Sequence, residues 1–356
     1  MKPVKLEVGM DEWTSFLSCN EHYIFHCPEY VSFIESTFPT AKACYLGVMS
    51  NSKLTGLFPF FYVSQPGLKR VLSFLFPSMA SPKSISSAYN DYGGPCGSID
   101  RDKLFAMLHV LKNKFSSPYL EIRQGLEKFD EYFANLPSLK YKRFILPLSS
   151  KESVWNGIQK YKRKAIGKAE SAGVVTREIP LSDIDSLYSL YSKNMRAFGD
   201  PPYPKRYFIN FYKYFIDKGL GKCFGAYKDG KLIAMLLGYC CSGRVHIIIA
   251  VSDDKYLELR PNDAVHWAFI SWACDNKYKL FDFGHTREGS GQYTYKERWG
   301  GECKDLNRYY LLSAGQELPN MDPTDKANAL YPMIWRRLPL CVTTSIGPWL
   351  RESLGI

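Results

Sequence analysis

The chain has 356 residues, of which 46% are hydrophobic and 23% charged, so it can bury a substantial core, and disorder over its length is excluded. Its 46 lysines and arginines exceed its 35 aspartates and glutamates, which gives a net charge of +11. This surplus favours an anionic partner, either nucleic acid, a phosphorylated small molecule or an acidic membrane face. A basic protein without such a partner is the alternative.

The ten cysteines form no CxxC pair, and residues 1–9 are too polar for a signal peptide. No run approaches the roughly 18 apolar residues needed to span a bilayer. We therefore expect reduced thiols and a cytoplasmic location. Cys19, His22, His26 and Cys27 lie close together, but they lack the two separated ligand pairs of familiar zinc folds, so packing is a better interpretation than a metal site.

The first half of the chain predicts a hairpin, a helix and a strand in that order. The two hairpin strands, 44–49 and 54–63, flank a polar turn at Asn51-Ser52. A helix is expected over 101–115 and a strand over 119–123.

The second half repeats this order more clearly. Asp229-Gly230 and Ser242-Gly243 are hairpin turn signals, and they separate three expected strands at 222–227, 232–240 and 245–251. Apolar residues at helical spacing then predict a helix over 262–276, with Pro261 at its start, and a strand follows at 280–283.

We interpret this order as a duplicated α+β unit, each copy a mixed, mainly antiparallel sheet flanked by helices. The expected domains are residues 1–148 and 149–319. A tail, 320–356, combines Trp335 and Trp349 with arginines and prolines. The favoured interpretation is that the tail packs back on the body; peripheral membrane contact through the tail is the alternative.

The segment that we expect to form the reactive site is residues 281–302, with the sequence FDFGHTREGSGQYTYKERWGGE. Glycines let the backbone approach a ligand closely, and the nearby cations can meet a phosphate or a developing oxyanion. No hydrolase or NTP-binding motif accompanies them.

This stretch, with the preceding LRPNDAVHWAFISWACDNKY, resembles the C-terminal signature of FemAB-type proteins. Further matches are YGGP at 92–95, the lysine-rich YKRKAIGKAESAGV, and MRAFGDPPYP at 195–204. The resemblance covers most of the chain. It implies two tandem acetyltransferase-like (GNAT-like) domains, with the main site in the C-terminal one.

The resemblance also implies acyl transfer, most simply of an aminoacyl group from aminoacyl-tRNA to an amine of a phosphorylated or lipid-linked cell-envelope precursor. Lys296 matches the functional lysine of the family, and Asp91 is a candidate base in the N-terminal domain. The helix that carries Arg163 and Lys164 matches one that helps to hold substrate phosphate. Further substrate-binding residues implied in this way are Tyr203, Tyr256, Asn262, His285, Arg287 and Tyr293.

An aminoacyl-tRNA donor requires no metal or organic cofactor. The alternative donor is acetyl-coenzyme A or another acyl-coenzyme A, used for N-acylation of a nucleotide sugar or polysaccharide unit. The turn before residue 262 has no glycine, and Pro261 removes an N–H donor, which weakens this alternative. His285-Thr286 also departs from the Arg-Ser of many relatives. A non-catalytic binding subunit of a surface-polymer export system is the third interpretation.

Overall fold

The computed structural model describes residues 2–5, 10–63, 84–87, 90–319 and 326–354. It divides into two compact units: unit 1 comprises Met1–Leu139 with Asn307–Ile356, and unit 2 comprises Lys140–Leu306. These divisions differ from the predicted boundaries after residues 148 and 319. The physical reason is strand pairing, since β9 (Ser138–Pro147) pairs with a strand of unit 2 and β15 (Glu302–Leu312) pairs with a strand of unit 1.

Unit 1 contains two groups of hydrogen-bonded strands. The first has the order β1-β3-β4-β7, and in the second the C-terminal part of β15 is followed by β8-β6-β5-β2. The strands are β1 (Lys2–Lys5), β2 (Ala41–Ala43), β3 (Leu46–Ser50), β4 (Lys53–Phe58), β5 (Phe61–Val63), β6 (Ser84–Ser86), β7 (Cys96–Gly97) and β8 (Tyr119–Arg123). The helices are α1 (Asp11–Cys19), α2 (Pro28–Thr37), α4 (Arg101–Lys114), α5 (Asp130–Phe133), α12 (Lys326–Arg337) and α13 (Leu340–Leu354).

Most of the predicted elements of the first half are confirmed, but the expected strand 54–63 is in fact two strands, β4 and β5, which pair with β3 and β2 respectively. Pro59 lies between them and has no N–H to donate to a continuous ladder. β3 and β4 form the hairpin, and Asn51 and Ser52 both take positive φ at its turn. Helix α4 begins after Asp100, whose side chain accepts a hydrogen bond from the Lys103 amide. The core of unit 1 is aromatic. Trp13, for example, is fully buried against Tyr45 and donates its indole N–H to the His26 carbonyl.

The His26 ring belongs to this core. Its Nε2 lies 3.1 Å from the Gly94 carbonyl oxygen, and its Nδ1 lies 3.0 Å from the Tyr23 amide. Burial lowers the pKa of His26 to about 4, so the ring is neutral at neutral pH. These contacts give the buried histidine a structural role.

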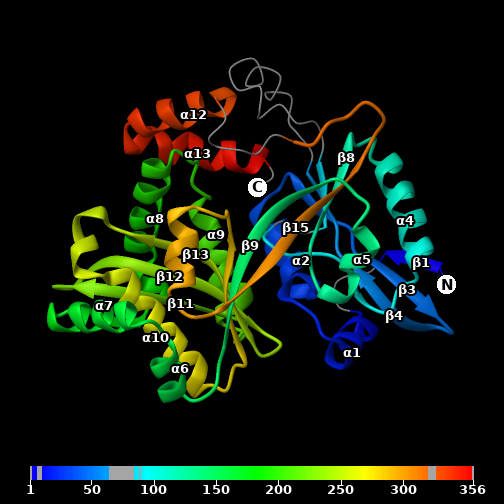
Figure 1. The fold of residues 1–356 in the computed structure, drawn as a ribbon. Coiled ribbons are helices and arrows are strands. Elements are labelled where there is room, and N and C mark those ends of the chain that lie inside the picture. The colour runs from blue at the N-terminus through cyan, green and yellow to red at the C-terminus, as the bar shows by residue number, and fades with distance from the viewer. Residues whose placement is uncertain (1, 6–9, 64–83, 88–89, 320–325, 355–356) are drawn as a thin grey trace. The chain divides into compact units, whose positions relative to one another are not determined.

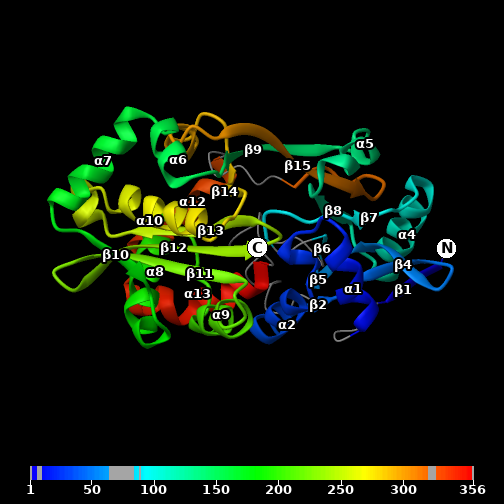
Figure 2. The same ribbon diagram turned by 90° about the horizontal axis from the view of Figure 1, so that it is seen from below.

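Unit 2 is one mainly antiparallel sheet with helices on both faces. Its strand order is β10-β11-β12-β13-β14-β9, and the pair β13-β14 is parallel. Helices α7 and α10 lie on one face, while α8 and α9 lie on the other (Figures 1 and 2). The strands are β10 (Val175–Glu178), β11 (Gly221–Lys228), β12 (Lys231–Cys241), β13 (Arg244–Ser252) and β14 (Leu280–Thr286). The helices are α6 (Lys151–Gly157), α7 (Lys160–Ser171), α8 (Ile184–Phe198), α9 (Lys205–Phe211), α10 (Pro261–Asp275) and α11 (Gly291–Glu297).

The predicted strands and helix of this half are confirmed, with ends extended by a few residues. Both predicted hairpin turns have positive φ at their two central residues, as Asp229 (49°) and Gly230 (78°) show. Such turns match the twist of the flanking strands. Residues 232–240 of β12 are all buried, because α10 covers one face of the strand and α8 the other.

The tail forms two helices, α12 and α13, that pack side by side (Figure 1). Pro339 separates them, while Pro332 and Pro348 lie inside them. The tail therefore breaks into two helices at Pro339, whereas the helices continue through Pro332 and Pro348. Within the part of the chain that the structure describes, no helix is long and apolar enough to cross a membrane.

Candidate active site

Strands β13 and β14 separate soon after they meet. They pair in register at three positions, from Arg244 with Leu280 to His246 with Asp282, although both strands continue further. On its other side β14 pairs with β9, and that register is irregular between Asp282 and His285. The end of β14, which lies within the predicted motif 281–302, is therefore shaped by contacts other than regular strand pairing.

Lys296 holds the end of β14 to helix α11. Its Nζ donates hydrogen bonds to the carbonyl oxygens of Gly284 at 3.1 Å and His285 at 2.8 Å. Ser290 caps the start of helix α11, and its hydroxyl accepts a hydrogen bond from the Tyr293 amide. The ammonium group is thus fixed at the end of a buried strand, as a site for electrostatic stabilisation requires.

Three further predicted residues lie with Lys296 on the β14–α11 segment. The ring of His285 meets the Tyr141 ring edge to face at 5.6 Å, and the guanidinium carbon of Arg287 lies 6.0 Å from the centre of the same ring. Tyr293 packs edge to face against Phe144 at 5.0 Å. The side chains of His285 and Arg287 thus share one ring, that of Tyr141, while Tyr293 packs on a different ring, Phe144 of β9.

A buried ion pair lies on the other side of α11 and was not predicted. Lys162 of α7 donates from Nζ to Asp263 Oδ1 of α10 at 2.7 Å, and both side chains are at least 95% buried. The same Nζ lies 3.2 Å from the ring centre of Tyr295 and 4.8 Å from that of Trp299. Burial lowers the pKa of Lys162 to about 8, because loss of hydration outweighs the attraction of Asp263.

His266 completes this cluster. Its Nδ1 donates to the Asn262 carbonyl oxygen at 2.7 Å and lies 3.2 Å from the Tyr295 hydroxyl oxygen. The ring stacks on Trp299. The pKa of His266 is lowered to about 3, chiefly by burial and to a smaller extent by the charges of Lys162 and Lys296. The imidazole is therefore neutral at neutral pH, and Nδ1 carries its proton.

Helix α10 begins at a turn in which several amide groups already donate hydrogen bonds within the chain. The amides of Tyr256 and Arg260 donate to carbonyl oxygens within the preceding 3₁₀ turn, Asp254–Leu259 with its cap Asp253. The Lys255 amide donates to the Asp253 side chain. Asp263 and Ala264 both donate to the Arg260 carbonyl, and Asn262 donates from its side chain to Ser252 Oγ at 2.9 Å. Asn262 thus joins the start of α10 to the end of β13.

Arg163 and Lys164 lie on different faces of α7. Arg163 donates to the carbonyl oxygens of Trp155, Asn156 and Ile158 at 3.1, 3.1 and 2.6 Å, so its guanidinium group caps the end of α6. Lys164 is exposed and lies on the solvent face with Lys160 and Lys168. The three exposed lysines fit the predicted phosphate contact, whereas the contacts of Arg163 are those of a structural residue.

The two predicted tyrosines have separate surroundings. Tyr203 stacks on Tyr207 at 4.3 Å, with the two ring planes 5° apart. Tyr256 has the Lys231 ammonium 4.5 Å from its ring centre. Both tyrosines are half-buried, and their roles in binding remain predictions.

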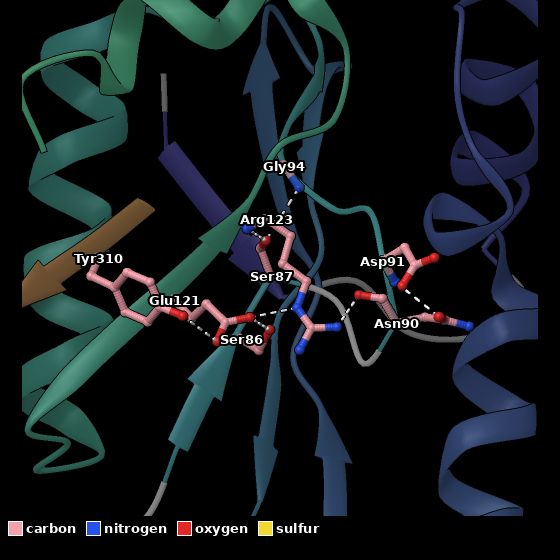
Figure 3. Close-up of polar contacts among 8 residues, drawn as sticks. All are labelled: Ser86, Ser87, Asn90, Asp91, Gly94, Glu121, Arg123 and Tyr310. Atoms are coloured by element: carbon pink, nitrogen blue, oxygen red, sulfur yellow. Dashed lines mark hydrogen bonds and ion pairs between the residues drawn. The ribbon is translucent and has the colours of Figure 1, made fainter. Parts of the chain in front are cut away.

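Asp91 belongs to unit 1, on a loop held by Arg123 (Figure 3). Arg123 is buried; its guanidinium group donates to Glu121 and to the Asn90 carbonyl oxygen, and its amide donates to Ser87 Oγ at 2.7 Å. Burial alone would raise the pKa of Glu121, but the nearby arginines hold it below its usual value. The loop that carries Asp91 is thus fixed to β8, and the predicted role of Asp91 as a base remains a prediction.

Comparisons with known proteins identify the class. Residues 158–297 match the family described as "Acetyltransferase (GNAT) domain", a range that contains Lys162, Asp263, His266 and Lys296. No match was found among curated proteins. The C-terminal site thus belongs to an acyltransferase domain of the GNAT type.

Solved structures extend the likeness to both units. FemX is 11% identical, with a TM-score of 0.64 over 86% of this chain and 97% of that one. The C-terminal domain of a protein assigned as a lysylphosphatidylglycerol synthetase, from Agrobacterium fabrum, is 11% identical with a TM-score of 0.57 over 91% and 95%. A tandem GNAT protein from the clavulanic acid biosynthesis pathway is 12% identical with a TM-score of 0.55 over 89% and 99%. The chain therefore has the fold of the FemAB-like tandem GNAT proteins, and the predicted fold class is confirmed.

Proposed function

We propose that this GNAT-type acyltransferase moves an aminoacyl group from aminoacyl-tRNA to an amine of a phosphorylated or lipid-linked cell-envelope precursor. The fold shared with FemX and with a protein assigned as a lysylphosphatidylglycerol synthetase supports aminoacyl transfer to an envelope component. The observation that carries the choice of donor is the start of α10.

A helix start binds a pyrophosphate through N–H groups that point at the ligand. Pro261 has no N–H, and the amides of Arg260 and Asp263 donate within the chain. Asp263 also places a carboxylate in the first turn of α10, where it is paired with Lys162. A second anion at this position would meet a turn in which several donors are engaged and Pro261 lacks one, which disfavours coenzyme A and favours a donor bound elsewhere.

The proposed reaction is aminolysis of an ester. The acceptor amine attacks the carbonyl carbon of the aminoacyl ester, so a C–N bond forms, the C–O bond to the tRNA ribose breaks, and the proton lost by the amine goes to the leaving ribose oxygen. Negative charge develops on the carbonyl oxygen in between. The fixed ammonium of Lys296 supplies a positive charge for that oxygen, an effect of several kcal/mol in enzymes generally.

The exposed lysines of α7 form a surface to which the tRNA of the donor can bind. Lys160, Lys164 and Lys168 lie on one side of this helix, while Lys162 and the apolar positions face inward. A row of exposed cations suits the backbone phosphates of RNA, which contribute most of the affinity in non-specific binding. We assign this face to the tRNA and the β14–α11 segment to the reacting ester.

The test is a comparison of donors with purified protein. Labelled aminoacyl-tRNA and labelled acetyl-coenzyme A are each offered with an envelope-precursor fraction, with and without ribonuclease. We expect transfer from aminoacyl-tRNA that ribonuclease abolishes and that Lys296→Met loses, while Lys213→Met, an exposed lysine on unit 2, retains it.

Two results would contradict the proposal. Transfer from the coenzyme A thioester alone would establish the N-acyltransferase alternative. Precursor binding that is equal in wild type and Lys296→Met, without transfer from either donor, would establish a binding subunit.

A further inference from the structure

The tail helices α12 and α13 border a groove with a volume of about 210 Å³. Among the described residues, all the side chains that line it are aliphatic or aromatic, including Trp335, Trp349, Leu338 and Leu350. Ile334 and Ile346 also line it, although 41% and 44% of these two side chains respectively remain exposed. The groove is therefore open to solvent along an apolar edge.

Positive charge flanks this edge. Arg336 and Arg337 are exposed and lie between Trp335 and Leu338 on α12. Residues 326–354 contain four basic residues and a single acidic one, Glu352. Exposed aliphatic side chains beside tryptophan and arginine are the composition of a segment that lies in a membrane interface.

We propose that the α12–α13 hairpin docks on a membrane surface that contains anionic lipid, with an acyl chain entering the groove between Trp335 and Trp349. The apolar edge would enter the boundary between headgroups and acyl chains, while Arg336 and Arg337 meet lipid phosphates. With 12 and 15 residues, the helices suit this shallow position.

The positive charge of the tail favours a membrane over a second copy of the chain as the partner of the groove. In a two-fold dimer the same patch faces itself, so the basic tail helices of one copy would face the equally basic tail helices of the other. Like charges across an interface oppose association, whereas an anionic lipid surface attracts them. The proposal is independent of the transfer reaction, because membrane binding is measured without donor or acceptor.

The experiment is co-sedimentation of the full chain with vesicles of phosphatidylcholine, with or without phosphatidylglycerol. We expect binding to the phosphatidylglycerol vesicles, weakened by added salt because the lipid charge is screened. Arg336→Gln and Arg337→Gln should each reduce partitioning about five-fold. The double variant Ile334→Asp/Ile346→Asp should abolish it.

A control for the single variants Ile334→Asp and Ile346→Asp comes from the same unit. Val110 on α4 is 68% exposed, so Val110→Asp adds one negative charge at an exposed apolar position outside the tail and should bind as wild type does. Brominated acyl chains should quench tryptophan fluorescence in wild type and do so less in Trp349→Phe.

The proposal is overturned if vesicles fail to bind the wild-type chain, or if the Ile334→Asp/Ile346→Asp variant binds them as strongly as wild type. A concentration-dependent dimer that this double variant dissociates would assign the groove to a second copy instead.

Discussion

Lys162 Nζ lies 2.7 Å from Asp263 Oδ1, and this pair joins two helices that are about a hundred residues apart in the chain. Lys162 comes from α7 and Asp263 from the first turn of α10, and Tyr295 of α11 lies against the same ammonium. The three helices that carry the candidate site thus meet at one buried cation.

Removing that cation should destabilise unit 2. Lys162→Met leaves Asp263 buried without its donor, which typically costs about 3–5 kcal/mol in the free energy of unfolding. The double variant Lys162→Met/Asp263→Asn should recover part of the loss, because no buried charge remains at the site. Urea unfolding followed by tryptophan fluorescence measures both, since Trp299 contacts Lys162. An unchanged single variant would show that the pair contributes nothing to stability.

Part of this cluster was available from the sequence. Lys162 stands in phase with Ala165, Ile166 and Ala169, so helical periodicity places it on the buried face of α7. A lysine in that position must have a partner, but the pattern does not say which. Asp263 is distant in sequence, and only the packing of α7 on α10 brings it there.

The fold was predictable in its local parts and less so in its connections. Turn residues at 229–230 and 242–243 predicted the hairpins of unit 2, because their backbone angles are fixed locally. The return of β15 to unit 1 was missed, because a strand carries no local signal of its pairing partner. The contacts of Arg163 with the end of α6 depend likewise on how two helices meet.

Lys296→Met should reduce the transfer rate about 10²–10³-fold, the typical cost of removing a group that stabilises an oxyanion. Lys296→Arg keeps the charge but not the compact ammonium that bonds two successive carbonyls, so we expect an intermediate rate. Initial rates with labelled aminoacyl-tRNA measure both variants, with thermal unfolding as the control for folding. Equal transfer rates in Lys296→Met, Lys296→Arg and wild type would show that Lys296 takes no part in the reaction.

The exposed face of α7 should determine how salt affects tRNA binding. Replacing Lys160, Lys164 and Lys168 by Gln should weaken binding and lower the slope of log affinity against log salt by about 0.7–0.9 for each phosphate that the variant no longer neutralises. Filter binding over a range of salt concentrations measures this slope. Lys213→Gln is the matched control. A slope that the triple variant leaves unchanged would place the tRNA elsewhere.

Two buried histidines should make the chain sensitive to acid. The pKa of His26 is lowered to about 4 and that of His266 to about 3, both chiefly by burial. Below pH 6.5 the unfolded chain binds protons that the folded chain does not, so stability falls as the pH falls toward 4. Each histidine lowers the free energy of unfolding by at most about 1.4 kcal/mol for each pH unit of acidification.

His26→Gln and His266→Gln test this, because each should flatten the pH dependence between 6.5 and 4 relative to wild type. Urea unfolding at a series of pH values gives the comparison, and His109, an exposed histidine of α4, provides the control variant His109→Gln. Parallel pH profiles for all four proteins would mean that neither buried ring governs the response.

A close backbone approach in unit 1 gives the last prediction. A Cβ on Gly125 would lie 1.9 Å from the Gly93 carbonyl oxygen, so the segment after β8 and the YGGP segment must separate to admit it. Gly125→Ala should therefore destabilise the chain by at least about 1–3 kcal/mol, the usual cost of overpacking. Gly167 lies inside α7 with open space around it, so Gly167→Ala should stabilise by about 0.5–1 kcal/mol through helix propensity. Denaturant midpoints compare the two, and a Gly125→Ala variant as stable as wild type would show that the two segments can move apart at no cost.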